Sequence, residues 1–294
     1  MVERSPWFDA FCHAMLLVGV VAMCLPLYYA IIAATHSLDD VLLIPMPLTP
    51  GTELLANIQT ALAKPDFARQ LLNSLIVAVG VTVVKIAASF IAAFAVTYFK
   101  YRFRAFAFWM IFGTLMLPVE VRIVPTYEVA ANVLAPINWL LGGVIEVNLE
   151  WNLLDSYTGL IMPLAASATG TFLFRQLFLT VPDELLEAAK IDGAGPVQFA
   201  RDVLWPISRT NVIALTVILF VFGWNQYLWP MLIITEPSML TAVVGLAKTL
   251  PGVADSVPHW HTAMASTLLI SLPPVVVVLV LQRWFVKGLV DAEK

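Results

Sequence analysis

The stretch VPDELLEAAKIDGAGPVQFARDVLWP, residues 181–206, is the most polar ordered-looking segment of a chain that consists mostly of long apolar runs. Thr180 and Asp183 have the spacing of a capping arrangement, and acidic residues fill the first turns, where the helix dipole favours them. Gly193 and Gly195 are expected to end this helix, and the proline that follows them can begin another. The segment therefore predicts two short helices that meet at a glycine corner.

The composition of the whole chain excludes an ordinary soluble protein. The 294 residues are 60% hydrophobic and 12% charged, whereas a typical globular domain is about 45–50% apolar and about 25% charged. With 16 Lys and Arg and 20 Asp and Glu, a soluble fold of this length could not cover its core. We therefore predict an all-α, polytopic membrane protein.

Six apolar runs are long enough to be membrane helices, which need about 20 apolar residues. The predicted spans cover residues 11–34, 71–99, 106–125, 157–179, 207–235 and 262–286 of a single transmembrane domain, residues 1–294. Residues 133–149 are also apolar, but Pro136, a glycine pair and Glu146 favour an outer loop on the membrane surface over a seventh crossing. Six spans place both termini on one side.

The basic residues predict which side that is, because Lys and Arg are enriched in cytoplasmic loops. If the amino terminus is cytoplasmic, 11 of the 16 basic residues lie on that side: Arg4, Lys100, Arg102, Arg104, Arg175, Lys190, Arg201, Arg209, Arg283, Lys287 and Lys294. The outer connections and outer ends of spans keep Lys64, Arg69, Arg122 and Lys248. Both termini and residues 181–206 are therefore expected in the cytoplasm.

The spacing inside residues 181–206 resembles the EAA motif of ABC importer permeases: E-A-A, three residues, G, nine residues, an aliphatic residue, one residue, an apolar residue and P. We call residues 181–206 the EAA segment. The matching residues are Glu187, Ala188, Ala189, Gly193, Val203, Trp205 and Pro206, with Trp205 where leucine is more common. In that family the paired short helices dock into a groove on the ATP-binding subunit.

This resemblance implies a role for each motif position. The residues expected to couple the chain to an ATPase are Glu187, Ala188, Ala189, Asp192, Gly193 and Pro206. The acidic residues would make charged contacts, the alanines would let backbones approach closely, and the glycine would form the turn. The alternative interpretation is that residues 181–206 form only a polar linker between two membrane helices, without a coupling role.

The resemblance extends over essentially the whole chain and narrows the family. NSLIVAVGVTVVKIAASFIAAFAVTYF (73–99), FWMIFGTLMLPVEVRIVPTYEV (108–129), ATGTFLFRQLF (168–178), GWNQYLWPMLI (223–233) and LQRWFVKGLVDAEK (281–294) are similar to the glycerol-3-phosphate permeases, relatives of the maltose permeases. The family implies the six-span type I permease fold in the bacterial inner membrane. It also implies a second, non-identical permease, two ATPase copies that bind ATP and Mg, and a periplasmic solute-binding protein.

Four residues are candidates for the substrate path. Lys85 is the charged residue deep within the second span, on one helical face with small and polar residues, where it could attract a phosphate or simply pack. Arg122 could make a bidentate contact with phosphate, or it could anchor a helix end at the lipid headgroups. Asn225 and Gln226 could hydrogen-bond glycerol hydroxyls, although their aromatic neighbours equally suit an interface belt.

Other functions fit the sequence less well. An ion-coupled secondary transporter commonly carries acidic residues or histidines within its spans, and no span centre here has one. The chain has no HExxH, GxSxG or P-loop motif and no metal-ligand spacing, so we expect no enzyme, no metal site and no cofactor in this chain. No basic stripe indicates nucleic acid. A neutral-sugar permease of the same family stays open.

Overall fold

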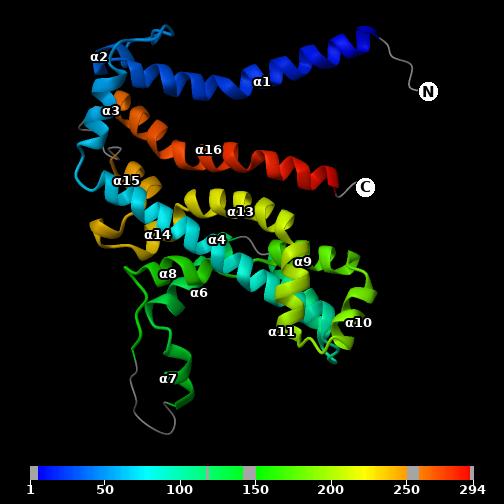
Figure 1. Ribbon diagram of the computed structural model, residues 1–294. Helices are drawn as coiled ribbons and strands as arrows, with labels where there is room; N and C mark the ends of the chain where they lie inside the picture. The colour runs from blue at the N-terminus through cyan, green and yellow to red at the C-terminus, as the bar shows by residue number, and fades with distance from the viewer. Residues whose placement is uncertain (1–5, 117–118, 142–149, 250–257, 292–294) are drawn as a thin grey trace. The chain divides into compact units, whose positions relative to one another are not determined.

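The computed structural model describes residues 6–116, 119–141, 150–249 and 258–291, and every regular element within them is helical. In chain order (Figure 1) these are α1 (Pro6–Thr35), α2 (Leu38–Val41), α3 (Leu54–Leu62), α4 (Phe67–Tyr98), α5 (Arg104–Gly113), the 3-10 turn η1 (Thr114–Met116), α6 (Val119–Ala131), α7 (Ala135–Leu141), α8 (Tyr157–Ile161), η2 (Met162–Leu164), α9 (Ala168–Thr180), α10 (Asp183–Ile191), α11 (Pro196–Phe199), the π-helical turn η3 (Ala200–Leu204), α12 (Trp205–Ile207), α13 (Arg209–Trp224), α14 (Leu228–Ile233), η4 (Pro237–Met239), α15 (Ala242–Thr249) and α16 (Trp260–Asp291). The predicted all-α fold is confirmed.

Three of these helices are long and apolar enough to cross a membrane: α1, α4 and residues 260–282 of α16. Two further crossings arise if each bent helix pair is one span. The first pair, residues 157–164 with 168–180, bends by 50°, and the second, residues 196–207 with 209–224, bends by 75°. The count of six spans therefore stays a prediction.

The predicted third span and outer loop are only partly described. Residues 106–125 fall on α5, η1 and α6, and residues 117–118 between η1 and α6 lie outside the described residues. In the predicted loop, α7 has 7 residues, far fewer than the roughly 20 that a crossing needs. Residues 142–149, with the glycine pair and Glu146, lie outside the described residues.

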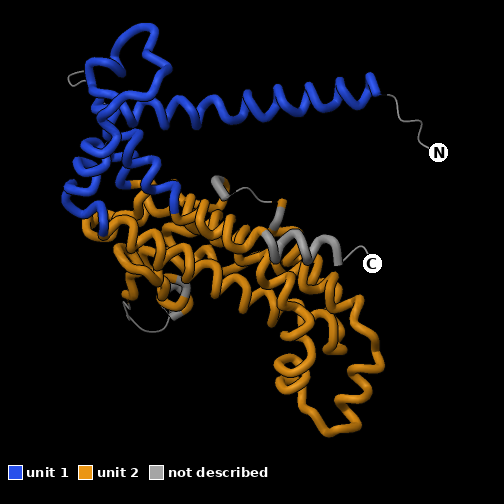
Figure 2. Tube along the Cα trace, turned by 45° about the horizontal axis from the view of Figure 1, so that its top comes forward, with its two compact units in different colours: residues 1–68, 245–272 blue, residues 69–244, 273–294 orange. Residues whose placement is uncertain are grey.

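Two compact units make up the chain: unit 1 contains residues 1–68 and 245–272, and unit 2 contains residues 69–244 and 273–294 (Figure 2). In unit 1, α1 exposes apolar side chains over most of its length, and only its last turn, Ile32–Thr35, is buried. Such an exposed apolar helix suits a lipid environment.

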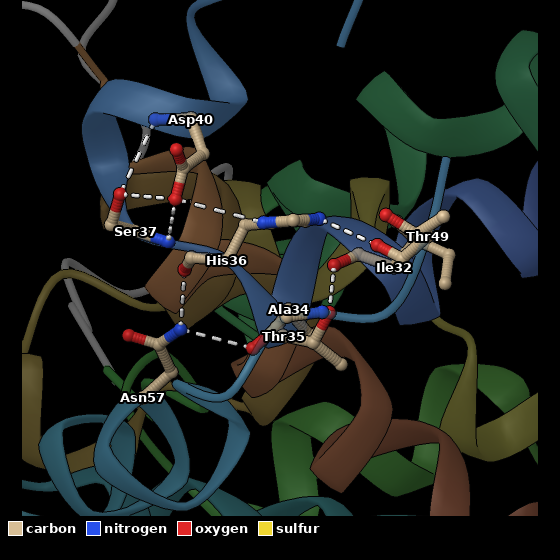
Figure 3. Close-up of polar contacts among 9 residues, drawn as sticks. Ile32, Ala34, Thr35, His36, Ser37, Asp40, Thr49 and Asn57 are labelled. Carbon is tan, nitrogen blue, oxygen red and sulfur yellow. Dashed lines mark hydrogen bonds and ion pairs between the residues drawn. The ribbon is translucent and has the colours of Figure 1, made fainter. Parts of the chain in front are cut away.

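The end of α1 is fixed by polar contacts with the chain that follows it (Figure 3). The last carbonyls of a helix have no partner within the helix. Asn57 of α3 donates to the carbonyls of Ala34 and His36, each at 2.9 Å. The Thr35 hydroxyl accepts from the Gly51 N–H at 2.8 Å. The Glu53 N–H donates to the Thr35 carbonyl at 2.8 Å, so the last two carbonyls of α1 have partners.

The core of unit 2 is built along α4. Its first half contributes Val77 and Val81 to a cluster with residues of α8 and α14. Its second half contributes to an aromatic cluster made of Ile86, Phe90, Ala93, Phe174, Phe178, Phe199, Leu204, Leu215 and Leu219. Phe199 and Leu204 belong to the EAA segment, which is therefore packed into the core and not a free linker.

Candidate functional site

The first helix of the EAA segment, α10, begins without a side-chain cap. Its N-cap residue is Pro182, and no side chain hydrogen-bonds the first turn. The predicted capping by Thr180 is wrong, because this residue still belongs to α9 and its hydroxyl donates to the Leu177 carbonyl at 2.7 Å. Asp183 and Glu184 nevertheless occupy the first turn, where the helix dipole stabilises their negative charges.

The glycine corner lies at Gly193, whose φ is +75°. The Ala194 N–H donates to the Ala189 carbonyl at 2.8 Å, and the Gly193 N–H donates to the Lys190 carbonyl at 3.1 Å. This pair of bonds is the Schellman arrangement, which requires a left-handed residue after the helix end and so favours glycine. Gly195 has an ordinary φ of −74° and does not make the corner.

The second helix of the segment is less regular than the sequence indicates. It consists of α11, the π-helical turn η3 and α12, and it meets α13 at a bend of 75°. Pro206 in α12 lacks the N–H that would continue the helix ladder. Just after it, the buried Ser208 hydroxyl donates to the Leu204 carbonyl at 2.7 Å. Sequence reasoning missed both the π turn and Ser208.

One side of the EAA segment is packed and the other is exposed. Ala189 packs against the aromatic cluster, whereas Glu187, Ala188, Asp192 and Gly193 are exposed. Two apolar side chains share this exposure, Ile191 at 86% and Val197 at 81%. We call Glu187, Ala188, Ile191, Asp192 and Val197 the docking face. The exposure of Ile191 and Val197 was not predicted from the sequence. Exposed apolar residues in a polar segment can indicate an interaction surface.

Glu187 has no ion-pair partner among the residues that the structure describes. Charged pairs in those residues are formed by His36 with Asp40 and by Arg201 with Asp202. The Arg201–Asp202 pair lies in the EAA segment, but both side chains are exposed, and exposed pairs of this kind contribute little to stability. The Glu187 carboxylate is thus available to a partner.

Lys85 lies inside unit 2 with 8% of its surface exposed. Its Nζ is 4.0 Å from the centroid of the Phe222 ring in α13, a cation–π contact. Ala78, Thr82 and Ser89 on the same face of α4 are also buried, as a face turned away from lipid requires. In the described part of the chain no carboxylate forms an ion pair with Lys85.

Arg122 of α6 is exposed and lines a cavity of about 520 Å³. Trp151 and Met162 line the same cavity, whose wall is mostly apolar. Lys85 is not among the residues that line this cavity. Both cations belong to unit 2, and within the described ranges neither has an acidic ion-pair partner.

Gln226 and Asn225 lie where α13 ends. Gln226 donates from Nε2 to the Phe222 carbonyl at 3.1 Å. Gln226 therefore bonds to the backbone of the residue whose ring contacts Lys85. Asn225 is exposed and forms the C-cap of α13. Phe222 was not predicted, because its contact joins helices that are far apart in the sequence.

A close approach of two backbones supports this arrangement. A Cβ on Gly223 would lie 3.0 Å from the Cα of Ala78 in α4, closer than real side chains normally come. Glycine at this position lets α13 approach α4, and the neighbouring Phe222 then reaches Lys85. Small residues at such contacts are typical of membrane helix packing.

Comparison with known proteins gives the family. Residues 85–291 match the family of binding-protein-dependent transport system inner membrane components. The chain belongs to this family. It is 48% identical to the sn-glycerol-3-phosphate transport system permease protein UgpE of Escherichia coli (strain K12), and 50% identical to the UgpE of Yersinia pestis bv. Antiqua (strain Antiqua). Each alignment covers 100% of both chains.

Solved structures agree on the fold. A chain of a bacterial ABC transporter that imports the acidic polysaccharide alginate superposes with a TM-score of 0.73 at 21% identity, covering 97% of this chain and 99% of that chain. A chain of an alginate transporter in complex with its periplasmic protein gives 0.65 at 15% identity, covering 93% of each. The protein therefore has the type I ABC importer permease fold and is a multi-pass transport component of the membrane.

Proposed function

We propose that the chain forms half of the translocation pathway of an ATP-driven importer for glycerol 3-phosphate, and for glycerophosphodiesters that share its phosphate. The observation that carries this proposal is the identity of 48–50% over the full length of permeases named for sn-glycerol 3-phosphate. The other half would be a second, non-identical permease. A periplasmic binding protein would deliver the solute, as the family name implies.

The phosphate would be received by the two cations of unit 2. A dianion that leaves water needs positive charge in its new surroundings. Arg122 would provide it at the wall of the cavity of about 520 Å³, and Lys85 would provide it in the interior of unit 2. Phe222 holds the Lys85 ammonium in place through its ring. Asn225, which is exposed at the end of α13, is placed to hydrogen-bond a glycerol hydroxyl.

ATP hydrolysis would act through the EAA segment, with ATP and Mg bound by a dimer of partner ATPase subunits. The docking face offers two carboxylates that form no ion pair among the described residues, together with exposed apolar side chains, a combination that suits a groove on another protein. Because Phe199 and Leu204 belong to the aromatic cluster along α4, a push on the docking face would move α4 and α9 with it. Both termini and the EAA segment would lie in the cytoplasm of a bacterial inner-membrane protein.

Reconstitution in vesicles tests this function directly. The chain is inserted with its partner permease and ATPase, the binding protein is added outside, and uptake of labelled glycerol 3-phosphate is measured with and without ATP inside. We expect uptake that requires both ATP and the binding protein. Uptake that follows an imposed ion gradient without ATP would contradict the importer mechanism. ATP-dependent uptake of a neutral sugar, with none of glycerol 3-phosphate, would contradict the substrate.

A further inference from the structure

A second positively charged cavity lies in unit 2, between the end of α4 and the helices α5 and α9. Its volume is about 290 Å³, and Arg104, Arg175 and Gln176 line it together with aromatic rings. Val96, which also lines this cavity, follows Lys85 by eleven residues on α4, which is about 16 Å along a helix. The cavity is therefore separate from the proposed substrate path.

Arg175 is held in this cavity by an aromatic ring, and it has no anionic partner in the part of the chain that the structure describes. Its guanidinium lies 4.1 Å from the centroid of the Phe108 ring. Its Nε is buried and has no hydrogen-bond partner. A buried guanidinium N–H without an acceptor is costly, and the cation–π contact leaves the in-plane N–H groups free to donate.

Arg104 faces the same cavity from the first turn of α5. It donates one long hydrogen bond, 3.5 Å from Nη1 to the Thr97 carbonyl. The hydroxyl of Thr97 is itself buried without a partner. No Asp or Glu lines the cavity, and neither arginine forms an ion pair within the described residues, in contrast to Arg201 with Asp202.

The two arginines that line this small cavity provide the donor groups that a phosphate group requires. The planar guanidinium donates two parallel N–H groups to two oxygens of one anion, which an ammonium group cannot do. Gln176 adds an amide donor at the rim. No acceptor among the described residues reaches the Arg175 Nε, and a bound anion would satisfy it.

The surroundings of the cavity indicate where this anion comes from. Phe103, Phe106 and Trp109 are each 63–64% exposed beside it. Exposed aromatic residues next to basic ones mark the level of the lipid headgroups, and basic pockets between membrane helices on the cytoplasmic side bind anionic headgroups.

We propose that the cavity lined by Arg104 and Arg175 binds a phosphate group at the inner surface of the membrane, supplied by the headgroup of an anionic phospholipid. The aromatic rings would contact the glycerol and upper acyl region, while the two guanidinium groups hold the phosphate. Inorganic phosphate carries the same chemistry and is the second possible source. The site does not depend on which solute the importer carries.

The test measures ligand binding to the purified importer complex. In one arm, delipidated complex in neutral detergent is titrated with phosphatidylglycerol or phosphatidylcholine, and bound lipid is counted by native mass spectrometry. In the other arm, inorganic phosphate is titrated by calorimetry. We expect a preference for phosphatidylglycerol that falls about tenfold in Arg175→Gln and in Arg104→Gln, since each removes charge-assisted hydrogen bonds. Arg175→Lys should bind less tightly than the native protein but better than Arg175→Gln.

Arg209→Gln is the matched control, because Arg209 is exposed on the same predicted side and does not line the cavity. Arg104 is exposed, so its variant should assemble even if Arg175→Gln does not. Saturable phosphate binding that disappears in the cavity variants, without any lipid preference, would support the site and identify free phosphate as its ligand. Equal losses in Arg209→Gln, or no binding in either arm, would overturn the proposal.

Discussion

At the scale of single residues, the charge of Lys85 is the feature on which the substrate path depends. Replacing Lys85 by Met removes the ammonium group but keeps a long apolar side chain over Phe222. We expect ATP-dependent uptake of glycerol 3-phosphate to fall by about tenfold or more, because a hydrogen bond to a charged group contributes roughly 1.5–3 kcal/mol. Lys85→Arg keeps the charge and should retain much of the activity. Equal loss in the two variants would mean that Lys85 serves packing alone.

Glu187 carries a different single-residue prediction, since it is exposed and has no ion pair in the described residues. Glu187→Lys should abolish uptake and weaken capture of the ATPase while the chain still inserts into the membrane. Immunoblots of membrane fractions and copurification of the ATPase measure the two effects. Glu184→Lys is the matched control, because Glu184 is also exposed on α10 but lies outside the motif. Normal uptake by Glu187→Lys would rule out the docking role.

At the scale of elements, the corner of the EAA segment can be tested with two glycines that differ in one property. A Cβ on either Gly193 or Gly195 would meet no atom within 4 Å, but Gly193 has φ +75° and Gly195 has φ −74°. Gly193→Ala should therefore destabilise the corner by about 1 kcal/mol and reduce uptake per ATP hydrolysed. Gly195→Ala should leave both unchanged. Similar behaviour of the two variants would show that the Schellman turn has no part in coupling.

A second element-scale contact joins the chain before α8 to the chain after α14. Asp155 accepts hydrogen bonds from the N–H groups of Thr235 (2.7 Å) and Glu236 (2.9 Å) and from the Thr235 hydroxyl. Burial acts to raise the pKa of Asp155, but the bonds from Glu236 and Thr235 outweigh it and hold the pKa below its ordinary value of 3.8. The folded protein thus favours the carboxylate.

This shift predicts how stability depends on pH. A carboxyl with a lowered pKa in the folded state contributes stability that is fully present above its unfolded pKa, here the ordinary value of 3.8, and is lost as the pH falls through the folded pKa. We expect Asp155→Asn to lower the melting temperature of the detergent-solubilised protein at neutral pH. The difference from the native protein should shrink below about pH 4. A difference that is constant with pH would contradict this role of the carboxylate.

The elements also show what the sequence can predict. The two short helices and the corner follow from local residue preferences, because glycine, proline and the acidic first turn act within a few positions. The π turn and the 75° bend do not, since they depend on packing of Leu204 and Ser208 in a core that distant helices build. Lys85 was found as an isolated charge in an apolar run, but Phe222 was not, because a ring–cation contact between two helices leaves no local pattern.

At the scale of the whole molecule, the remaining prediction is the orientation in the membrane, on which the coupling mechanism depends. In a background with Cys12→Ser and Cys24→Ser, Val197→Cys places a thiol on the docking face, where the native side chain is 81% exposed. Glu150→Cys places one at an exposed position of the predicted outer loop. A membrane-impermeant maleimide added to spheroplasts should label Glu150→Cys. It should label Val197→Cys only after the spheroplasts are lysed. Labelling of Val197→Cys from outside would place the docking face away from any cytoplasmic ATPase, and ATP hydrolysis could then not act through the EAA segment.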